Sequence, residues 1–247
     1  MEVAKVENVT RVYAVGKVET QALRGVNLTI ESGEFTALVG PSGSGKTTLL
    51  QLLGCLDRPT SGRVIINGKD VSQLNRNQRA DMRRGAIGFI FQFFALIPTL
   101  TAYENIEMPL LLNGHSVSDR QARVSELLET VGLGDRGGSR PDQLSGGQQQ
   151  RVAIARALVA EPALILGDEP TGNLDTRASD EIAGLLRQVS DEWGRAVVMV
   201  THDPRIAAYA DRIVFLKDGV IIDDSRLAGQ GAGKSQLVAD HLSALTA

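Results

Sequence analysis

The sequence predicts an α/β fold in which a mainly parallel sheet has an antiparallel β edge and a helical insert. Three observations lead to this prediction. Polar and apolar residues alternate near the start of the chain, in VAKVENVTRVY and VNLTIESGEF, which indicates antiparallel strands. The runs FTALVG, ALILGD and AVVMVTH are apolar without alternation, which is typical of strands buried on both faces of a parallel sheet. Residues 93–158 are rich in helical patterns, as in DRQARVSELLETVGL.

The remaining elements follow in chain order. TTLLQLLGCL has helical spacing and stops near Pro59, and a polar, basic helix is expected over residues 74–84. RVIINGKDV indicates a strand with an Asn-Gly turn, SDEIAGLLRQVSDEWG a crossover helix, and RIVFLKDGVIIDD a hairpin that turns at Asp218 and Gly219. We therefore expect one domain, and its parts are a core (residues 1–92 and 159–225), a helical subdomain (93–158) and a tail (226–247).

The composition is that of an ordinary globular protein. The chain has 247 residues, of which 43% are hydrophobic and 22% charged, and its net charge is −3. This charge does not favour nucleic-acid binding, so we expect no nucleic-acid partner. Cys55 is the only cysteine and cannot form an intrachain disulfide, which favours a reducing compartment. The first 13 residues lack the apolar segment of a signal peptide, so a cytoplasmic location is expected.

One uncharged stretch, residues 85–103, is nearly as long as a membrane-spanning helix. Gln92 and Pro98 interrupt it, and no aromatic belt flanks it. Its division into GFIFQ and FFALIPTLTAYENI favours a buried strand followed by a turn and a helix.

The first candidate site is a glycine-rich loop between a predicted strand and a predicted helix, matching G-x-x-x-x-G-K-[ST]. Lys46 is expected to reach the β- and γ-phosphates of a nucleotide, and the Thr47 hydroxyl can bind Mg²⁺. A plain glycine turn would explain the glycines but not the Lys-Thr pair that follows them. The expected nucleotide-binding residues are Gly40, Pro41, Ser42, Gly43, Ser44, Gly45, Lys46, Thr47 and Thr48. A similar stretch, Gly231 to Ser235, has Ala228 in place of the first glycine and follows no apolar strand, so no nucleotide is assigned to it.

Two carboxylates end the apolar strand ALILGD, at Asp168 and Glu169. The carboxyl ends of strands in α/β sheets are where ligands bind. Asp168 is expected to hold Mg²⁺ through water, and Glu169 to polarise the attacking water as a general base. His202 ends another apolar strand at the same edge; a lone histidine is more often structural, but this position favours a catalytic role.

A second glycine turn, LSGGQQQR at Leu144 to Arg151, opens onto a helix-like run. The N–H groups and dipole of a helix start attract anions, so the chain has two turns that could each bind a phosphate group. A glycine-rich helix start without a ligand would explain the two glycines alone.

The motifs together resemble ABC-type ATPases. The phosphate loop, Gln92, LSGGQ, LILGDEP, GNLD and His202 occur in the order typical of that family, between about Tyr13 and Asp224. GCLDRPTSG, FQFFALIPTLTAYENI and PTGNLD are most similar to the macrolide-export and lipoprotein-release branch. Two residues depart from the usual pattern: Gly167 replaces alanine before Asp168, and Ala95 replaces asparagine in FFALIP.

The resemblance implies a RecA-like phosphate-loop core that binds ATP and Mg²⁺ and hydrolyses ATP. It also implies a head-to-tail dimer, in which the LSGGQ motif of one chain closes over the nucleotide of the other, so closure depends on ATP. The residues expected across the dimer are Ser145, Gly146, Gly147, Gln148 and Asp175. Gln92 matches the glutamine that touches Mg²⁺ and the lytic water, and Tyr13 the aromatic that stacks on adenine, although Tyr13 also suits a place in the core.

The partners that the resemblance implies are integral membrane permease subunits, which would hold this chain on the inner face of the cell membrane. The apolar segments FFALIPTL and MPLLL are candidate docking surfaces, although each would also suit a core. The expected function is to couple ATP-driven dimerisation to export, lipoprotein release or force transmission across the envelope. A soluble ABC ATPase that acts on DNA or ribosomes and a non-hydrolysing ATP-dependent regulator are the alternatives. The first is disfavoured by the lack of a heptad run, and the second by the presence of Glu169 and His202.

Overall fold

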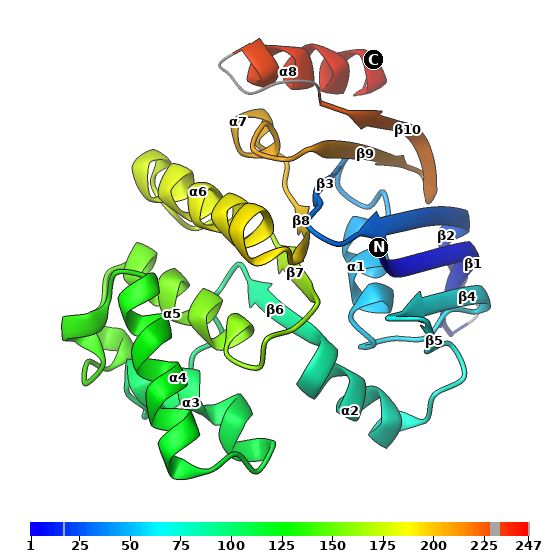
Figure 1. Cartoon of the computed structure of the whole chain (residues 1–247). Coiled ribbons are helices and arrows are strands. Elements are labelled where there is room, and N and C mark those ends of the chain that lie inside the picture. The colour runs from blue at the N-terminus through cyan, green and yellow to red at the C-terminus, as the bar shows by residue number, and fades with distance from the viewer. Residues whose placement is uncertain (17, 228–232, 247) are drawn as a thin grey trace.

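The computed structural model describes residues 1–16, 18–227 and 233–246 and contains two sheets (Figure 1). The smaller sheet is antiparallel and has the strand order β2-β1-β4-β5. Its strands are β1 (Glu2–Val15), β2 (Val18–Glu31), β4 (Ser61–Ile66) and β5 (Lys69–Asp70). The alternating sequence near the N-terminus therefore forms the antiparallel edge that it predicts.

The larger sheet has six strands in the order β10-β9-β3-β8-β7-β6. Neighbours from β9 to β6 run parallel, and β10 pairs antiparallel with β9. Its strands are β3 (Phe35–Val39), β6 (Ile87–Phe91), β7 (Leu164–Asp168), β8 (Ala196–Val200), β9 (Arg212–Lys217) and β10 (Val220–Arg226). The predicted α/β class, with a mainly parallel sheet and an antiparallel edge, is confirmed.

Two hydrophobic clusters cover the two faces of the larger sheet. Side chains alternate between the faces, so in β3 Leu38 joins one cluster while Ala37 and Val39 join the other. Helix α1 (Lys46–Leu53) supplies Leu49, Leu50, Leu52 and Leu53 to the first cluster, which also contains the inward side chains of β1, β2 and β4. The helix thus packs between the two sheets (Figure 1).

The second cluster is covered by helices that lie to the other side of the larger sheet. Those of the predicted helical segment are α3 (Ala102–Leu112), α4 (Val117–Thr130) and α5 (Gly146–Leu158), with short 3-10 turns at Gly134–Arg136 and Pro141–Gln143. Thr101, Ser116 and Ser145 cap the three helix starts by accepting a backbone N–H with the side chain. In Figure 1 these helices form a green group below the sheet, with α5 packed on β6 and α3.

The other helices are α2 (Arg76–Ala86), α6 (Thr176–Trp193), α7 (Pro204–Ala207) and α8 (Gly233–Thr246). The structure corrects several expected boundaries. The expected strand VNLTIESGEF is divided by a turn at Ser32 and Gly33, so its end belongs to β3 in the other sheet. Helix α6 begins three residues earlier than SDEIAGLLRQVSDEWG because Asp175 caps it. In the stretch Gly231 to Ser235, which was not assigned a nucleotide, Gly231 and Ala232 lie outside the described residues.

The uncharged stretch over residues 85–103 contains the end of α2, strand β6, a loop and the start of α3. None of the helices within the described ranges has the length and apolar character needed to cross a bilayer. The expectation of a buried strand followed by a turn and a helix is therefore confirmed.

Candidate functional site

The phosphate loop lies between β3 and α1, as expected. Its conformation requires glycine, since Gly40, Gly43 and Gly45 have φ angles of 147°, 79° and 104°. A Cβ atom on Gly45 would lie 2.6 Å from the carbonyl oxygen of Ala22 in β2. Gly45 is the N-cap of α1, and no side chain caps the helix there. The N–H groups of the helix start are therefore directed at the loop without a side-chain acceptor, which is the arrangement of an anion site.

Lys46 is folded back against the loop. Its Nζ donates to the carbonyl oxygens of Gly40 and Pro41, both at 2.8 Å, and lies 3.4 Å from the Ser44 hydroxyl. Burial lowers the pKa of Lys46, and the nearby carboxylates of Glu169 and Asp168 oppose that change. Pro41, Ser42 and Gly43 are exposed, whereas Ser44 is buried and Thr48 half-buried in the first turn of α1.

Thr47 and Asp168 come together from two parts of the chain. The Thr47 Oγ1 donates to Oδ1 of Asp168 at 3.3 Å, which places the end of β7 against the start of α1. Burial is the main cause that raises the pKa of Asp168; the hydrogen bond from Thr47 works in the opposite direction. Gly167 leaves β7 unbroken, and a Cβ there would lie 3.2 Å from Pro170.

Glu169 and His202 lie together just beyond β7 and β8. The Glu169 Oε1 is 3.4 Å from Nδ1 of His202, and the imidazole is 71% exposed. Glu169 has a φ of 47°, a left-handed conformation that is strained for a non-glycine residue. Its N–H donates to the carbonyl oxygen of Val200 at 3.1 Å, which fixes the backbone in that state. With the phosphate loop, these residues form one group at the carboxyl edge of the sheet.

Gln92 follows β6 at the same edge, and its partner is Asn173. The amide Nε2 of Gln92 is 3.4 Å from Oδ1 of Asn173, and Nδ2 of Asn173 donates to the Gln92 carbonyl at 3.0 Å. The structure therefore joins Gln92 to the GNLD segment and not directly to Thr47 or Asp168. Asn173 was not predicted as a contact of Gln92, although it belongs to the GNLD motif.

Gln150 is a second residue that the sequence reasoning missed. It is fully buried in α5, and its Nε2 donates to the carbonyl oxygens of Pro170 at 2.5 Å and Phe91 at 3.3 Å. Gln150 thus connects the LSGGQ helix to the residues that follow Glu169 and precede Gln92. The sequence does contain a signal for its burial. Gln150 is polar, yet its helical spacing places it on the same side of the helix as the apolar residues Ile154 and Leu158.

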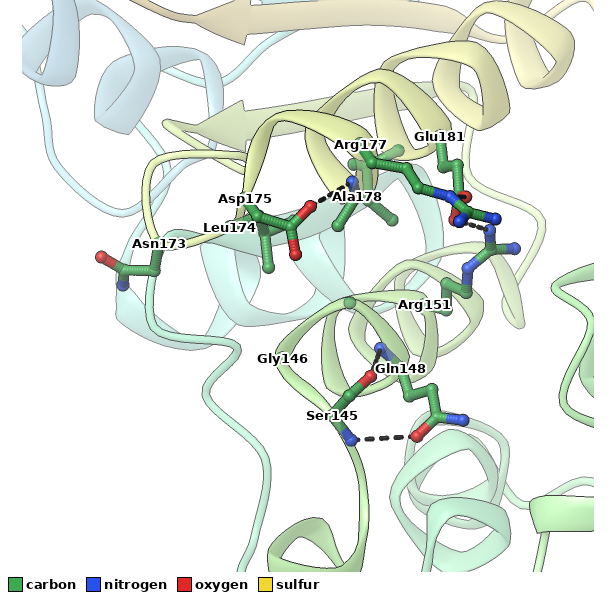
Figure 2. A pocket seen from close by; sticks show the side chains of 12 residues that line it. Ser145, Gly146, Gln148, Arg151, Asn173, Leu174, Asp175, Arg177, Ala178 and Glu181 are labelled. Carbon is green, nitrogen blue, oxygen red and sulfur yellow. Dashed lines mark hydrogen bonds and ion pairs between the residues drawn. The ribbon is translucent and has the colours of Figure 1, made fainter.

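The LSGGQ motif forms the start of α5, as expected. Ser145 is the N-cap, and its hydroxyl accepts from the N–H of Gln148 while the Gln148 side chain accepts from the N–H of Ser145 (Figure 2). Asp175 lies opposite on the loop that precedes α6 and caps that helix through Ala178. Between them is an open hollow of about 430 Å³.

One side of this hollow is fixed by an ion-pair cluster. Glu181 of α6 accepts from Arg151 of α5 at 2.9 Å and from Arg177 at 3.1 Å (Figure 2). Arg151 also donates to the Val131 carbonyl at the end of α4. The cluster therefore holds the LSGGQ helix against α6 and α4. Gly146 and Gly147 line the hollow with Ser145 and Gln148.

Tyr13 is half-buried on β1 and belongs to neither hydrophobic cluster. Its hydroxyl donates to Asp57 at 3.0 Å, and the guanidinium of Arg11 lies 4.4 Å from the ring centroid. The structure therefore does not place Tyr13 in the core.

Comparison with known proteins agrees with these features. A family model described as ABC transporter matches residues 23–172. An uncharacterized ABC transporter ATP-binding protein of Thermotoga maritima is 50% identical over 220 residues, which are 89% of this chain and 94% of that protein. The macrolide export ATP-binding/permease protein MacB of Syntrophobacter fumaroxidans is 47% identical over 93% of this chain, but the chain spans only 32% of that protein.

Solved structures agree as well. A dimeric structure of a post-hydrolysis state of the ATP-binding cassette MJ0796, bound to ADP and Pi, has a TM-score of 0.84 and 45% sequence identity. The match covers 92% of this chain and 99% of that one.

Proposed function

Because the chain belongs to the ABC transporter family, as a cassette that binds and hydrolyses ATP, we propose that two copies work as a head-to-tail pair joined to membrane permease subunits. In this pair the LSGGQ motif of each chain closes over the ATP on the phosphate loop of the other. ATP hydrolysis then reopens the pair and moves the permease. The family predicted from the motifs is confirmed, and the pairing of the two chains and the roles of the residues are our proposals.

The hollow at the start of α5 is the observation that carries the head-to-tail arrangement. Its volume of about 430 Å³ is within the range of ligand pockets, and the N-terminal N–H groups of α5 border it. It has a serine and two glycines but no phosphate-loop lysine and no Asp-Glu pair after a strand. An anion site that lacks the catalytic groups of the first site is suited to complete another chain's site.

Lys46 is proposed to bind the β- and γ-phosphates. Its ammonium group now has the Gly40 and Pro41 carbonyl oxygens as acceptors, and phosphate oxygens are stronger, charged acceptors. Arrival of ATP would draw the ammonium group toward the γ-phosphate, while the N–H groups of residues 43–48 surround the β-phosphate.

Thr47 and Asp168 fit a site for Mg²⁺. The described part of the chain holds no cluster of three or more acidic, histidine or cysteine residues that could bind a metal alone. Magnesium does not need one, because it usually takes one or two protein oxygens together with substrate phosphates and water. The hydroxyl of Thr47 and the carboxylate of Asp168, 3.3 Å apart, supply such oxygens. When bound, the ion neutralises charge on the β- and γ-phosphates. Gln92 would join this group after release from Asn173.

Glu169 is proposed to accept a proton from the attacking water. As the water oxygen bonds to the γ-phosphorus, the bond to the bridging oxygen of ADP breaks and phosphate leaves. The left-handed backbone of Glu169 directs its side chain beside His202 rather than along the strand. His202, on a separate strand end, would orient Glu169 and the γ-phosphate.

The membrane partner is proposed to bind a groove of about 430 Å³ between α2, β6, α3 and α5. Its apolar lining includes Ala95, Met108, Pro109 and Leu112, from the two segments expected to dock, and Phe91 at the end of β6. Three arginines border it: Arg83, Arg84 and Arg156. Leu112 and neighbouring Phe93 are 62% and 76% exposed. An apolar segment of a permease with acidic residues would fit this groove, and the protein would then lie on the cytoplasmic face of the membrane.

Two measurements test the proposal. If the ATPase site needs two chains, phosphate release per chain should rise with protein concentration until the pair is saturated. Constant specific activity over that range would contradict a shared site, and absence of hydrolysis would favour a regulator.

For the groove, Leu112→Asp should prevent co-purification of the permease, whereas the control Leu237→Asp, at an equally exposed leucine of α8, should not.

A further inference from the structure

The half-buried side chain of Tyr13 is held at two points. The guanidinium carbon of Arg11 lies 4.4 Å from the ring centroid, which is the geometry of a cation–π contact on one face. The phenol hydroxyl donates to Oδ2 of Asp57 at 3.0 Å. One face and the polar end of the ring are therefore occupied, so a ligand that stacks on the ring would use the second face.

Asp57 organises both of the other side chains. Arg11 makes a two-point ion pair with it, from Nε to Oδ2 at 2.8 Å and from Nη2 to Oδ1 at 2.9 Å. The backbone N–H of Arg58 also donates to Oδ1 at 2.7 Å. The carboxylate thus accepts three hydrogen bonds and makes a further ion contact with Nε of Arg11, and the Arg11 and Asp57 side chains are only 22% and 25% exposed. Such a bidentate ion pair fixes the orientation of the Arg11 guanidinium as well as neutralising its charge.

This cluster lies beside the phosphate loop. Thr20 of β2 pairs with Tyr13, and two residues later the Ala22 carbonyl oxygen packs against Gly45 of the loop. That separation is about 7 Å along the strand and about 5 Å across to β1. Asp57 follows α1, the helix that starts at Lys46, so this helix links the phosphate loop to the segment that carries Asp57. A nucleotide with its phosphates in the loop would extend its base toward Tyr13.

We propose that Arg11 and Asp57 are positioning residues that hold the Tyr13 ring ready to stack on the adenine of ATP. This inference rests on the proposed function, in which the phosphate loop binds ATP. Arg11 supports the ring from one face, so adenine stacks on the other. Because the phenol hydroxyl already donates its hydrogen bond to Asp57, the ring offers adenine a surface and no free donor. Fixing the ring before ATP arrives removes the entropy cost of ordering it during binding.

The test compares ATP with inorganic tripolyphosphate, which has the phosphates but no base. Calorimetry on the full chain measures the Kd of each, and steady-state kinetics give kcat and KM. In Arg11→Ala we expect the Kd and KM for ATP to rise about 3- to 10-fold, the range of a partly desolvated cation–π contact. The Kd of tripolyphosphate and kcat should change less than about twofold, since Lys46 and Glu169 are untouched.

Three further variants separate positioning from simple folding. Arg11→Lys keeps a cation over the ring and should recover at least half of the lost affinity. In a Tyr13→Ala background Arg11→Ala should add almost nothing, because Arg11 acts through that ring. Arg63→Ala is the matched control: Arg63 pairs with Glu7 of β1 at 2.6 Å in the same sheet, and it should leave the Kd of ATP unchanged.

The proposal would be overturned by an unchanged Kd for ATP in Arg11→Ala. It would also be overturned by equal losses for ATP and tripolyphosphate, or by a full Arg11→Ala effect without the Tyr13 ring. A wild-type chain that binds ATP but does not hydrolyse it contradicts the proposed function and still permits the comparison of the two ligands.

Discussion

Gly88 and Gly85 should respond in opposite ways to the same substitution, alanine. Gly88 lies in β6 at the point where α5 crosses it. A Cβ on Gly88 would overlap the backbone carbonyl of Ala157 in α5 and lie 2.9 Å from Cδ1 of Ile165. Backbone cannot rotate away, so Gly88→Ala must push α5 from the sheet. Gly85, in the last turn of α2, would have no atom within 4 Å of its new Cβ.

The expected magnitudes follow from these surroundings. Overpacking of a well-filled core costs about 1–3 kcal/mol, which lowers the Tm of a chain of this size by about 2–12 °C. Gly85→Ala is expected to stabilise the protein by up to about 1 kcal/mol, because alanine favours the helix and restricts the unfolded chain. Gly88→Ala should also slow hydrolysis, since β6 leads to Gln92 and α5 carries the LSGGQ motif.

Thermal and urea denaturation of both variants with wild type provide the measurement. Equal stability of Gly88→Ala and wild type would refute the close packing of α5 on β6. Destabilisation of the same size in both variants would show that the effect comes from loss of glycine and not from the contact with Ala157.

Three other predictions concern the loops around the site. Glu169→Gln should retain ATP binding but lower kcat by about 10²- to 10⁴-fold, measured by phosphate release, and a wild-type rate would exclude Glu169 as the base. Ala95 is exposed with a φ of 50°, a conformation that asparagine tolerates better, so Ala95→Asn should raise the Tm by about 1–4 °C; a lower Tm would contradict the strain. Burial raises the pKa of Asp168, so its contribution to stability is present below the unfolded pKa of about 3.9 and is lost as pH rises through the folded value. Asp168→Asn should therefore remove hydrolysis without lowering the Tm of the ligand-free protein at pH 7, and a lower Tm there would contradict the sign of this pKa shift.

The features that sequence predicted well depend on neighbouring residues. The phosphate loop could be placed because its glycines and the Lys-Thr pair are adjacent in the chain and because an apolar strand precedes them. Asp168, Glu169 and His202 could be placed at one edge because parallel strands end together there. Ser145 could be placed at a helix start because Gly-Gly and Gln148 follow it.

The features that sequence did not reveal depend on long-range packing. Gln150 contacts the carbonyl oxygen of Phe91, 59 positions away in the chain, and Tyr13 contacts Asp57, 44 positions away. In sequence, a glutamine in a helix and an aspartate after a helix look like ordinary surface residues. Their contacts become visible only in the folded chain, where their distant partners lie beside them. The break between β2 and β3 was also missed, although the alternation stops after Ile30 and Gly33 takes a positive φ where the chain changes sheet.

The shared site is tested most directly by Gly147→Asp. This substitution places a carboxylate in the first turn of α5, where negative charge favours the helix, so the motif should stay folded. Its Cβ would lie 3.3 Å from that of Ala178, a contact that a small shift relieves. The new charge would repel a γ-phosphate brought by the partner chain and leave the variant's own Lys46 loop unaffected.

The measurement is the ATP affinity of the monomer together with its ATP-dependent dimerisation, by calorimetry and analytical ultracentrifugation in a Glu169→Gln background. We expect Gly147→Asp to bind ATP with nearly unchanged Kd and to remain monomeric, whereas Lys46→Ala should lose ATP binding itself. If Gly147→Asp weakens ATP binding by the monomer as severely as Lys46→Ala does, both glycine turns serve one site within a single chain, and the head-to-tail account is wrong.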